Sequence, residues 1–223
     1  MTVEIREMQP DDATAVAAVI ATAWPDEPPV VARIAAAAHR CDHRGWVALD
    51  AGRVVGFLDG FTTRAQDGVR RWELDLIAVH PAAQGRGAAR GLVSAALEAV
   101  QGVDLIRALV RVDNTPMQRV MAQTGFAIEE SGPHVLMVAD ADPDAGASED
   151  TSLLEVVTLT YSGVWVEGAQ DLPRLIAARG QAARRGLDVA GAVIPADRAA
   201  ALDAAQAAGY VRIGEYDWWI KAL

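Results

Sequence analysis

The stretch Leu74-Asp-Leu-Ile-Ala-Val-His-Pro-Ala-Ala-Gln-Gly-Arg-Gly-Ala-Ala-Arg-Gly-Leu-Val93 decides the fold of this 223-residue chain. Apolar and polar residues alternate at its start, which predicts a β-strand that ends at His80-Pro81. Apolar residues at helical spacing follow and predict a helix over residues 85–101. Main-chain N–H groups at the start of a helix are unpaired and lie at the positive end of the helix dipole. The loop between strand and helix therefore suits a pyrophosphate.

The glycines of this loop narrow the choice of phosphate-binding motif. Gly85 and Gly87 would let phosphates approach the backbone, because neither has a Cβ atom to block them. A Rossmann loop requires G-x-G-x-x-G/A, and Arg90 occupies the last position here. A Walker loop is excluded, since no G-K-S/T follows. A glycine turn with a purely structural role remains open on this pattern alone.

Strand and helix signals alternate throughout the first 139 residues. We expect strands at 3–6, 45–50, 53–61, 69–79, 103–112, 127–130 and 134–139, and helices at 10–23, 29–39, 85–101 and 115–125. This order is typical of an α/β domain with a mixed sheet.

The rest of the chain repeats the later part of this order. Residues 140–151 carry five acidic residues and no basic one, which predicts a solvated linker; an acidic surface loop within one domain is the alternative. A shift of 84 positions places residues 102–130 on 186–214 with five identities, and the element order strand, helix, strand, helix, strand recurs. We therefore predict a complete domain over 1–139, a linker over 140–151 and an additional α/β half-domain over 152–223.

Composition excludes several function classes. The net charge is −10 and the pI about 4.8, so a nucleic-acid partner is not expected. Cys41, the single cysteine, fits a reducing compartment. The N-terminus lacks the features of a signal peptide, and no apolar stretch approaches the roughly 20 residues that span a bilayer, so we expect a cytoplasmic protein without a membrane partner. His39, Cys41 and His43 lack a fourth ligand for a closed zinc site, so we expect no metal.

Three linked motifs resemble the GNAT superfamily of acyl-CoA-dependent N-acyltransferases. Gln84-Gly-Arg-Gly-Ala-Ala89 matches the Q/R-x-x-G-x-G/A signature of that family and follows a strand that ends in His80-Pro81. Asp113-Asn114 and Gly125-Phe126 stand where the family has its N…GF helix. The resemblance covers residues 2–139. It implies the GNAT fold and an acetyltransferase with acetyl-CoA as co-substrate.

The resemblance also implies how acetyl-CoA would bind. The strand over 69–79 would separate from the strand over 103–112 at a bulge near Ile77, Ala78 and Val79, where the pantetheine arm would pair with exposed backbone. The pyrophosphate would lie on Gln84, Gly85, Arg86, Gly87, Ala88 and Ala89. Asn114 matches a residue that often contacts the CoA arm; a turn asparagine beside a helix N-cap is the alternative.

An amine acceptor needs a base before it can attack a thioester, because it is mostly protonated near neutral pH. The resemblance makes Glu73 the first candidate for a base or water-organiser and Asp75, on the same strand face, the second; ordinary polar strand residues are the alternative. Backbone N–H groups at the bulge would stabilise a tetrahedral intermediate. The tyrosine that serves the family as general acid is replaced by Met121, which cannot donate a proton.

In the half-domain, Asp171 occupies the position of Gly87, so we expect no CoA site there. Its aromatic residues are expected to serve packing, with an acceptor surface as the alternative. A half-sheet leaves an edge and a face, so this part should pack on the first domain or on a second chain, which allows a homodimer. We expect acetyl transfer from acetyl-CoA to a primary amine by direct attack. The alternative is a catalytically weak, CoA-binding regulatory or interaction protein.

Overall fold

The computed structural model describes residues 3–26, 29–146, 150 and 152–223. The N-terminal part contains β1 (Glu4–Glu7), the 3-10 turn η1 (Pro10–Asp12), α1 (Ala13–Ala23), α2 (Val31–Ala37), β2 (His43–Asp50), β3 (Arg53–Arg64), β4 (Arg70–Val79), the 3-10 turn η2 (Pro81–Ala83), α3 (Ala88–Ala99), β5 (Leu105–Arg111), α4 (Thr115–Gln123), β6 (Ala127–Ile128) and β7 (His134–Asp140). The C-terminal part contains β8 (Leu154–Val157), β9 (Ser162–Val166), α5 (Leu172–Arg184), β10 (Val189–Pro195), α6 (Ala199–Ala207) and β11 (Val211–Ala222). The predicted mixed α/β class is confirmed.

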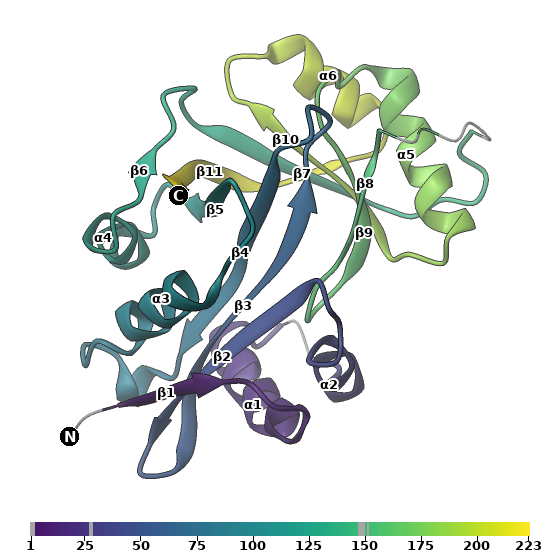
Figure 1. Ribbon diagram of the computed structural model, residues 1–223. Helices are drawn as coiled ribbons and strands as arrows, with labels where there is room; N and C mark the ends of the chain where they lie inside the picture. The colour runs from purple at the N-terminus through teal and green to yellow at the C-terminus, as the bar shows by residue number, and fades with distance from the viewer. Residues whose placement is uncertain (1–2, 27–28, 147–149, 151) are drawn as a thin grey trace.

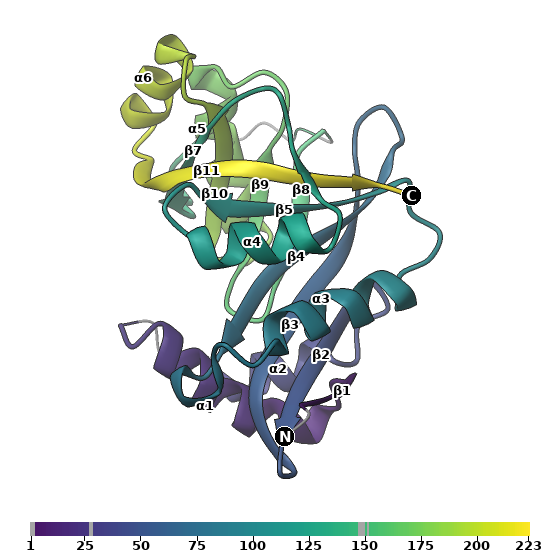
Figure 2. The same cartoon turned by 90° about the vertical axis from the view of Figure 1, so that its left-hand side faces the viewer.

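All the described strands belong to one sheet, in the order β1-β2-β3-β4-β5-β11-β7-β10-β9-β8, with β6 beside β11 (Figures 1 and 2). The two parts exchange strands at its centre. β11 of the C-terminal part lies between β5 and β7 and is antiparallel to both. β7 of the N-terminal part pairs in turn with β10. The expectation that the C-terminal part packs on the N-terminal domain is therefore met within a single sheet, while a homodimer stays a prediction.

The buried side chains show the same exchange. One core cluster lies beneath α3 and α4 and includes Trp219 of β11. A second lies beneath α5 and α6 and includes Val135 and Met137 of β7. A third lies beneath α1 and α2 on the opposite face of the sheet from α3, and it includes Leu159, from the turn between β8 and β9. Each part therefore completes a core of the other.

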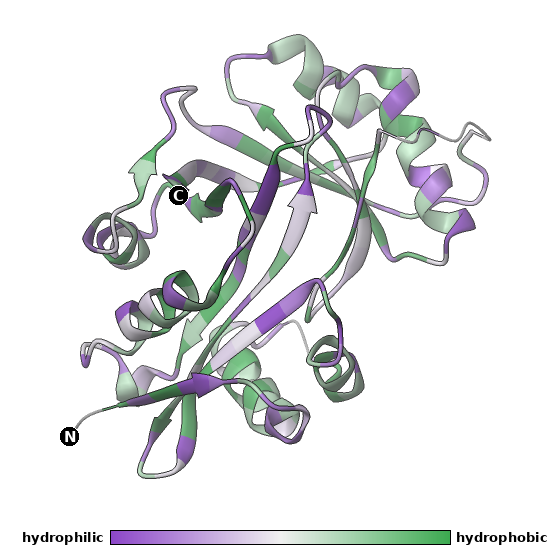
Figure 3. Cartoon of the chain, in the orientation of Figure 1, coloured by the Kyte–Doolittle hydropathy of each residue, from purple (hydrophilic) through white to green (hydrophobic). Residues whose placement is uncertain are grey.

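The internal repeat appears as matching elements. A shift of 84 residues carries β5 onto β10 and α4 onto α6 at both ends, and it carries the start of α3 onto the start of α5. The C-terminal part has two strands before its first helix, where the sequence predicts one. Hydrophobic and hydrophilic residues alternate in bands along α5 (Figure 3), as expected for a helix that lies with one face on a sheet.

Part of the predicted linker, residues 147–149 and 151, lies outside the described residues. The rest contacts α5: Arg184 donates to the carbonyl of Gly146, and Arg174 forms an ion pair with Asp150 at 2.8 Å. Asp140 ends β7. Among the described residues, no helix is long and apolar enough to cross a membrane.

Candidate active site

β4 and β5 separate in the middle of the sheet. Their parallel pairing ends at Leu74 and Ala108, although β4 continues to Val79. Main-chain groups of β4 beyond Leu74 therefore have no partner in β5, and an extended ligand could pair there like an added strand.

A bulge in β4 coincides with this separation. Leu58 pairs with Ile77 and Gly60 with Leu74, so Asp59 alone stands opposite both Asp75 and Leu76. The bulge was expected near residues 77–79, but it lies at residues 75–76. A bulge bends its strand, so the backbone of β4 turns where β4 and β5 separate.

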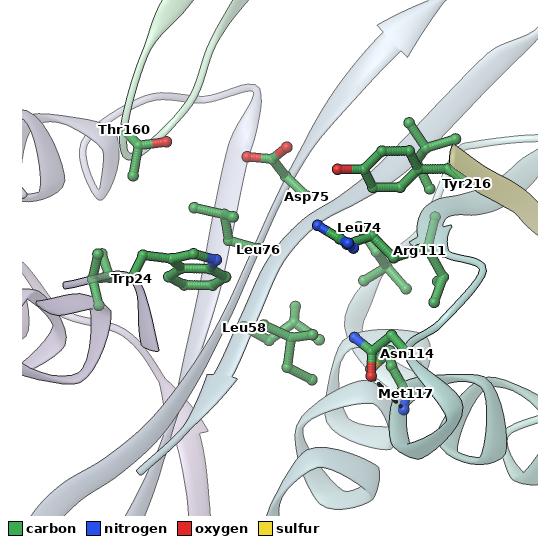
Figure 4. Close-up of a pocket in the computed structure, with 15 residues that line it drawn as sticks. Trp24, Leu58, Leu74, Asp75, Leu76, Arg111, Asn114, Met117, Thr160 and Tyr216 are labelled. Atoms are coloured by element: carbon green, nitrogen blue, oxygen red, sulfur yellow. Dashed lines mark hydrogen bonds between the residues drawn. The ribbon is translucent and has the colours of Figure 1, made fainter. Parts of the chain in front are cut away.

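A cavity of about 280 Å³ opens at the separation (Figure 4). Three regions of the chain line it. They are the end of α1 with Ile20 and Trp24, the adjoining parts of β3, β4, β5 and α4 with Leu58, Leu74, Asp75, Leu76, Ile77, Ala108, Leu109, Val110, Arg111, Asn114 and Met117, and the C-terminal part with Thr160 and Tyr216. The cavity is thus completed by residues from both parts.

Asp75 is the carboxylate of this cavity. Its Oδ2 atom is buried and has no hydrogen-bond partner among the described residues. Burial and the like charge of Asp59 raise the pKa of Asp75 from its ordinary 3.8 to about 7, although His43 acts in the opposite direction. A carboxylate with such a pKa takes and releases a proton near neutral pH.

Glu73, two residues earlier, lies in a different environment. Its carboxylate accepts hydrogen bonds from the Thr63 hydroxyl at 2.6 Å and from Nε of Arg107 at 2.7 Å. Arg71 and Arg107 also bind Glu167, which follows β9, at 2.8 and 3.0 Å. Glu73 therefore belongs to a cluster of two arginines and two glutamates that joins the two parts, and it does not line the cavity.

The loop before α3 lies at one end of this region and is exposed from Gln84 to Gly87. Gly85 and Gly87 have φ angles of +76° and +83°, a conformation that favours glycine. Gly87 is the N-cap of α3 and offers no side chain to its first N–H groups. Gln84 donates to the carbonyl of Val79 at 3.0 Å, and Arg86 forms an ion pair with Asp50 at 2.9 Å. The loop is thus anchored on both sides while its backbone stays open.

The other two residues singled out in the sequence lie close by. Asn114 is the N-cap of α4: its Oδ1 accepts from the N–H of Met117 at 3.2 Å, and Figure 4 shows its amide nitrogen on the cavity side. Met121 is fully buried in the core beneath α3 and α4. The thioether therefore packs as a core residue and does not line the cavity.

The sequence matches the profile of the Acetyltransferase (GNAT) family over residues 3–126, which is more than half of the chain. The chain belongs to this family. GNAT enzymes use acetyl-CoA and act on amine acceptors. No curated protein sequence matched the chain.

Solved structures share the GNAT fold over the whole chain. A tandem GNAT protein from the clavulanic acid biosynthesis pathway is similar at a TM-score of 0.61 and 13% identity, covering 99% of this chain and 98% of that one. A putative acetyltransferase from Pyrococcus horikoshii has a TM-score of 0.65 and 14% identity, with coverage of 100% and 90%. A glucosamine N-acetyltransferase region of a fungal multi-domain β-N-acetylglucosaminidase has a TM-score of 0.66 and 15% identity; the match covers 99% of this chain but 38% of that longer one.

The motifs did not indicate every residue of this GNAT site. The others lie in segments that are distant in the sequence. Asp59, on β3, stands opposite the bulge that contains Asp75, and His43, on β2, contacts Asp59. Thr160 and Tyr216 reach the cavity from the C-terminal part, and the hydroxyl of Tyr216 points across it toward Asp75 (Figure 4). In the sequence, Tyr216 was included only in the alternative that aromatic residues of the C-terminal part form an acceptor surface.

The predicted absence of a metal concerned His39, Cys41 and His43. His43 is buried against Asp59 and Val157, whereas Cys41 is exposed. In the part of the chain that the structure describes, no group of three or more His, Cys, Asp or Glu residues is placed to hold a metal ion.

Proposed function

We propose that this GNAT protein transfers the acetyl group of acetyl-CoA to a small primary amine by direct attack of the amine on the thioester. The observation that carries the proposal is the position of Asp75. This carboxylate lies on the wall of the cavity, at the bulge where β4 and β5 separate, and its pKa is raised to about 7.

The open loop before α3 supports pyrophosphate binding. Residues 84–89 would hold the pyrophosphate of acetyl-CoA with the first N–H groups of α3, because a phosphate is attracted to a helix N-terminus. A Cβ atom on Gly85 would meet no other atom within 4 Å, so the loop surface has room for a ligand. The unpaired backbone of residues 75–79 and the Asn114 amide would hold the pantetheine arm.

Asp75 would act as the base. An acceptor that enters as an ammonium ion is attracted to a carboxylate, and it must lose one proton before its nitrogen can attack. Asp75 takes that proton, the nitrogen bonds to the thioester carbon, and the carbon–sulfur bond breaks. The nitrogen loses a second proton as it becomes an amide, and this proton replaces the one that the departing thiolate receives. Main-chain N–H groups at the bulge would stabilise the thioester carbonyl oxygen, which carries a negative charge in the tetrahedral intermediate. Glu73 is held by Thr63 and two arginines and would keep its structural role.

Tyr216 would return a proton to the departing thiolate. Its hydroxyl points into the cavity opposite Asp75 (Figure 4), and a phenol is a stronger acid than the Thr160 alcohol or the Arg111 guanidinium on the same walls. The C-terminal part would thereby supply the acid that Met121 cannot provide.

The dimensions of the cavity favour a small acceptor. Its volume of about 280 Å³ lies just below the usual range of about 300–1,000 Å³ for small-molecule sites, and the end of the pantetheine arm must share it. Thr160, on the turn between β8 and β9, and Trp24, at the end of α1, face the cavity from one side (Figure 4). The amine would therefore sit between an aromatic ring and a carboxylate.

Release of free CoA thiol with each of a set of small primary amines tests the proposal. We expect release that depends on the amine, and a loss of about a hundredfold or more in Asp75→Asn with acetyl-CoA binding retained. Asp203→Asn, an exposed carboxylate on α6, is the matched control and should keep full activity. Binding of acetyl-CoA without amine-dependent release in the wild type would instead support the regulatory or interaction protein.

A further inference from the structure

His43 and Asp59 form a buried pair that the proposed chemistry does not use. Nδ1 of His43 lies 3.1 Å from Oδ1 of Asp59, and its Nε2 lies 2.7 Å from the carbonyl oxygen of Val157. Both side chains of the pair are almost completely inaccessible to solvent. Val157 ends β8, so the C-terminal part closes a pair whose two members belong to the N-terminal part.

These contacts determine how many protons the pair holds. A carbonyl oxygen can only accept, so Nε2 of His43 must carry a hydrogen. The contact between Nδ1 and Oδ1 then needs one more proton, which lies either on the imidazole or on the carboxyl group. In both arrangements the pair is neutral. Loss of this proton would leave a net negative charge in a buried site, which is costly.

The pair lies directly behind Asp75. Asp59 is the single β3 residue opposite the β4 bulge that contains Asp75. Oδ2 of Asp59 and Oδ2 of Asp75 are both buried, and neither has a hydrogen-bond partner among the described residues. Two carboxyl groups so placed cannot both ionise freely, because each charge raises the pKa of the other.

Other groups around Asp75 act in known directions. Glu73, on the same strand, also raises the pKa of Asp75 through its charge. Tyr161, from the turn between β8 and β9, has its own pKa raised by burial and by Asp75, so it stays neutral. Arg111 and Tyr216 lie on the far side of the cavity (Figure 4). Apart from burial, the charge of Asp59 has the largest effect on the pKa of Asp75.

We propose that the His43–Asp59 pair, closed by the carbonyl of Val157, is a positioning element of the reaction: it holds one proton behind Asp75 and thereby keeps Asp75 able to take up and release the acceptor's proton. This inference rests on the proposed function, in which Asp75 is the base. It assigns to the C-terminal part a role in the protonation of the N-terminal site, through one main-chain oxygen atom.

The pH dependence of kcat/KM for amine-dependent thiol release tests the pair. In the wild type we expect the rate to rise with pH through the pKa of Asp75, near 7, because only the carboxylate can accept a proton. The pair is neutral as a whole, but its negative end is the Asp59 carboxylate, whose effect on the pKa of Asp75 exceeds the opposite effect of His43. Asp59→Asn removes this negative end, while its amide can still donate to Nδ1 of His43. The rise should therefore move to lower pH by about one unit.

Two further variants identify the source of the shift. Asp12→Asn changes another buried carboxylate that is paired with a cation, Arg6, and it should leave the profile in place. Asp75→Asn should abolish the rise. If Asp59→Asn has the same profile as the wild type, the pair has no part in the reaction and the inference is overturned.

A titration of the wild-type protein gives an answer that depends on neither folding of the variant nor activity. We expect the carboxyl ¹³C signal of Asp75 and the imidazole ¹⁵N signals of His43 to change with one common midpoint. A His43 signal that stays constant through the Asp75 midpoint would overturn the inference. A common midpoint without any amine-dependent release would support the coupling and remove the proposed function alone.

Discussion

The two copies of the repeated unit begin their helices in opposite ways. α3 follows Gly87, whose φ of +83° and missing side chain leave the first N–H groups of the helix open. α5 follows Asp171, whose carboxylate accepts a hydrogen bond from the N–H of Arg174 at 3.0 Å. The same helical position therefore attracts an anion in the first copy and already carries one in the second.

The strands next to these helices also differ, because they separate in the first copy and stay paired in the second. β4 and β5 separate after Leu74 and leave a cavity. In the second copy, β9 stays paired with β10 up to its last residue, Val166, and the side chain of Gln170 donates to the carbonyl of Val193 at 2.9 Å. The second copy thus has a closed crevice. What it contributes to the site instead is a wall, through Thr160 and Tyr216, and a hydrogen-bond acceptor for His43, the carbonyl of Val157.

Gly87→Glu should have the largest effect, because it gives the first copy a carboxylate like that of the second. A side chain at this positive φ angle is strained, and its charge repels the pyrophosphate. We expect acetyl-CoA to bind about a thousandfold more weakly in calorimetric titration.

Two controls accompany this variant. Gly68→Glu places the same side chain at another exposed glycine with positive φ, at +90°, and should leave acetyl-CoA binding intact. Asp171→Gly should cost only a few tenths of a kcal/mol of helix capping and should not create a second site, since the crevice behind it stays closed. A stoichiometry of two in Asp171→Gly would show that the closed crevice is not what excludes acetyl-CoA.

Gly180→Ala should destabilise the second copy, although the equivalent position of the first copy is occupied by an alanine. The shift of 84 residues places Gly180 on Ala96, a buried residue of α3. A Cβ atom on Gly180 would overlap the main-chain oxygen atoms of Ala145 and Gly146, which cross α5 at this point. We expect a loss of about 3 kcal/mol in denaturant unfolding.

The matched variant is Gly91→Ala in α3. A Cβ atom on Gly91 would meet the flexible side chain of Ile5 at 3.3 Å rather than backbone, so the change should stay within about 1 kcal/mol. Equal effects of Gly180→Ala and Gly91→Ala would mean that the crossing over α5 gives way easily.

Glu167→Gln should weaken the join between the two copies. It leaves Arg71 and Arg107 with one carboxylate, Glu73, in a largely buried cluster, and we expect a cost of about 2 kcal/mol at pH 7. The two arginines outweigh the effect of burial and hold the pKa of Glu167 below its ordinary 4.5. A depressed pKa stabilises the fold above the unfolded value, and this stabilisation is lost as the pH falls through the folded value.

The difference between wild type and Glu167→Gln should therefore be full at pH 7 and shrink below about pH 4.5. Glu155→Gln breaks an exposed pair with Arg185 and should cost less than about 1 kcal/mol. Denaturant unfolding at several pH values measures both. A difference for Glu167→Gln that does not change with pH would indicate a packing effect and not a charge effect.

The sequence predicted what local patterns determine. Strand and helix periodicity gave most elements to within a few residues, and the glycines at 85 and 87 marked the loop before α3. The shift of 84 residues proved to hold at the level of whole elements. Each of these features depends on neighbours within one or two turns of the chain, so it can be recognised without tertiary structure.

Long-range pairing could not be predicted in this way. Glu73 and Asp75 share one alternating pattern, yet the structure gives Glu73 two arginine partners and Thr63. Among the described residues, Oδ2 of Asp75 has no hydrogen-bond partner. The difference depends on Arg107, on another strand, and on Glu167, in the other copy. The insertion of β11 between β5 and β7, which brings Tyr216 to the cavity, likewise has no local signal.

Tyr216→Phe should have the smallest of these effects and should test whether the second copy takes part in catalysis. Removal of the hydroxyl leaves the ring on the cavity wall, so acetyl-CoA and amine binding should change little. Water can replace a phenol as proton donor, so we expect kcat to fall only about tenfold, with KM nearly unchanged. Tyr210→Phe removes a buried hydroxyl that donates to the carbonyl of Leu175, far from the cavity, and should lower stability but not kcat. Equal kcat values for Tyr216→Phe and the wild type would restrict the second copy to shaping the cavity, because its only phenol on the cavity wall, among the described residues, would then have no part in proton transfer.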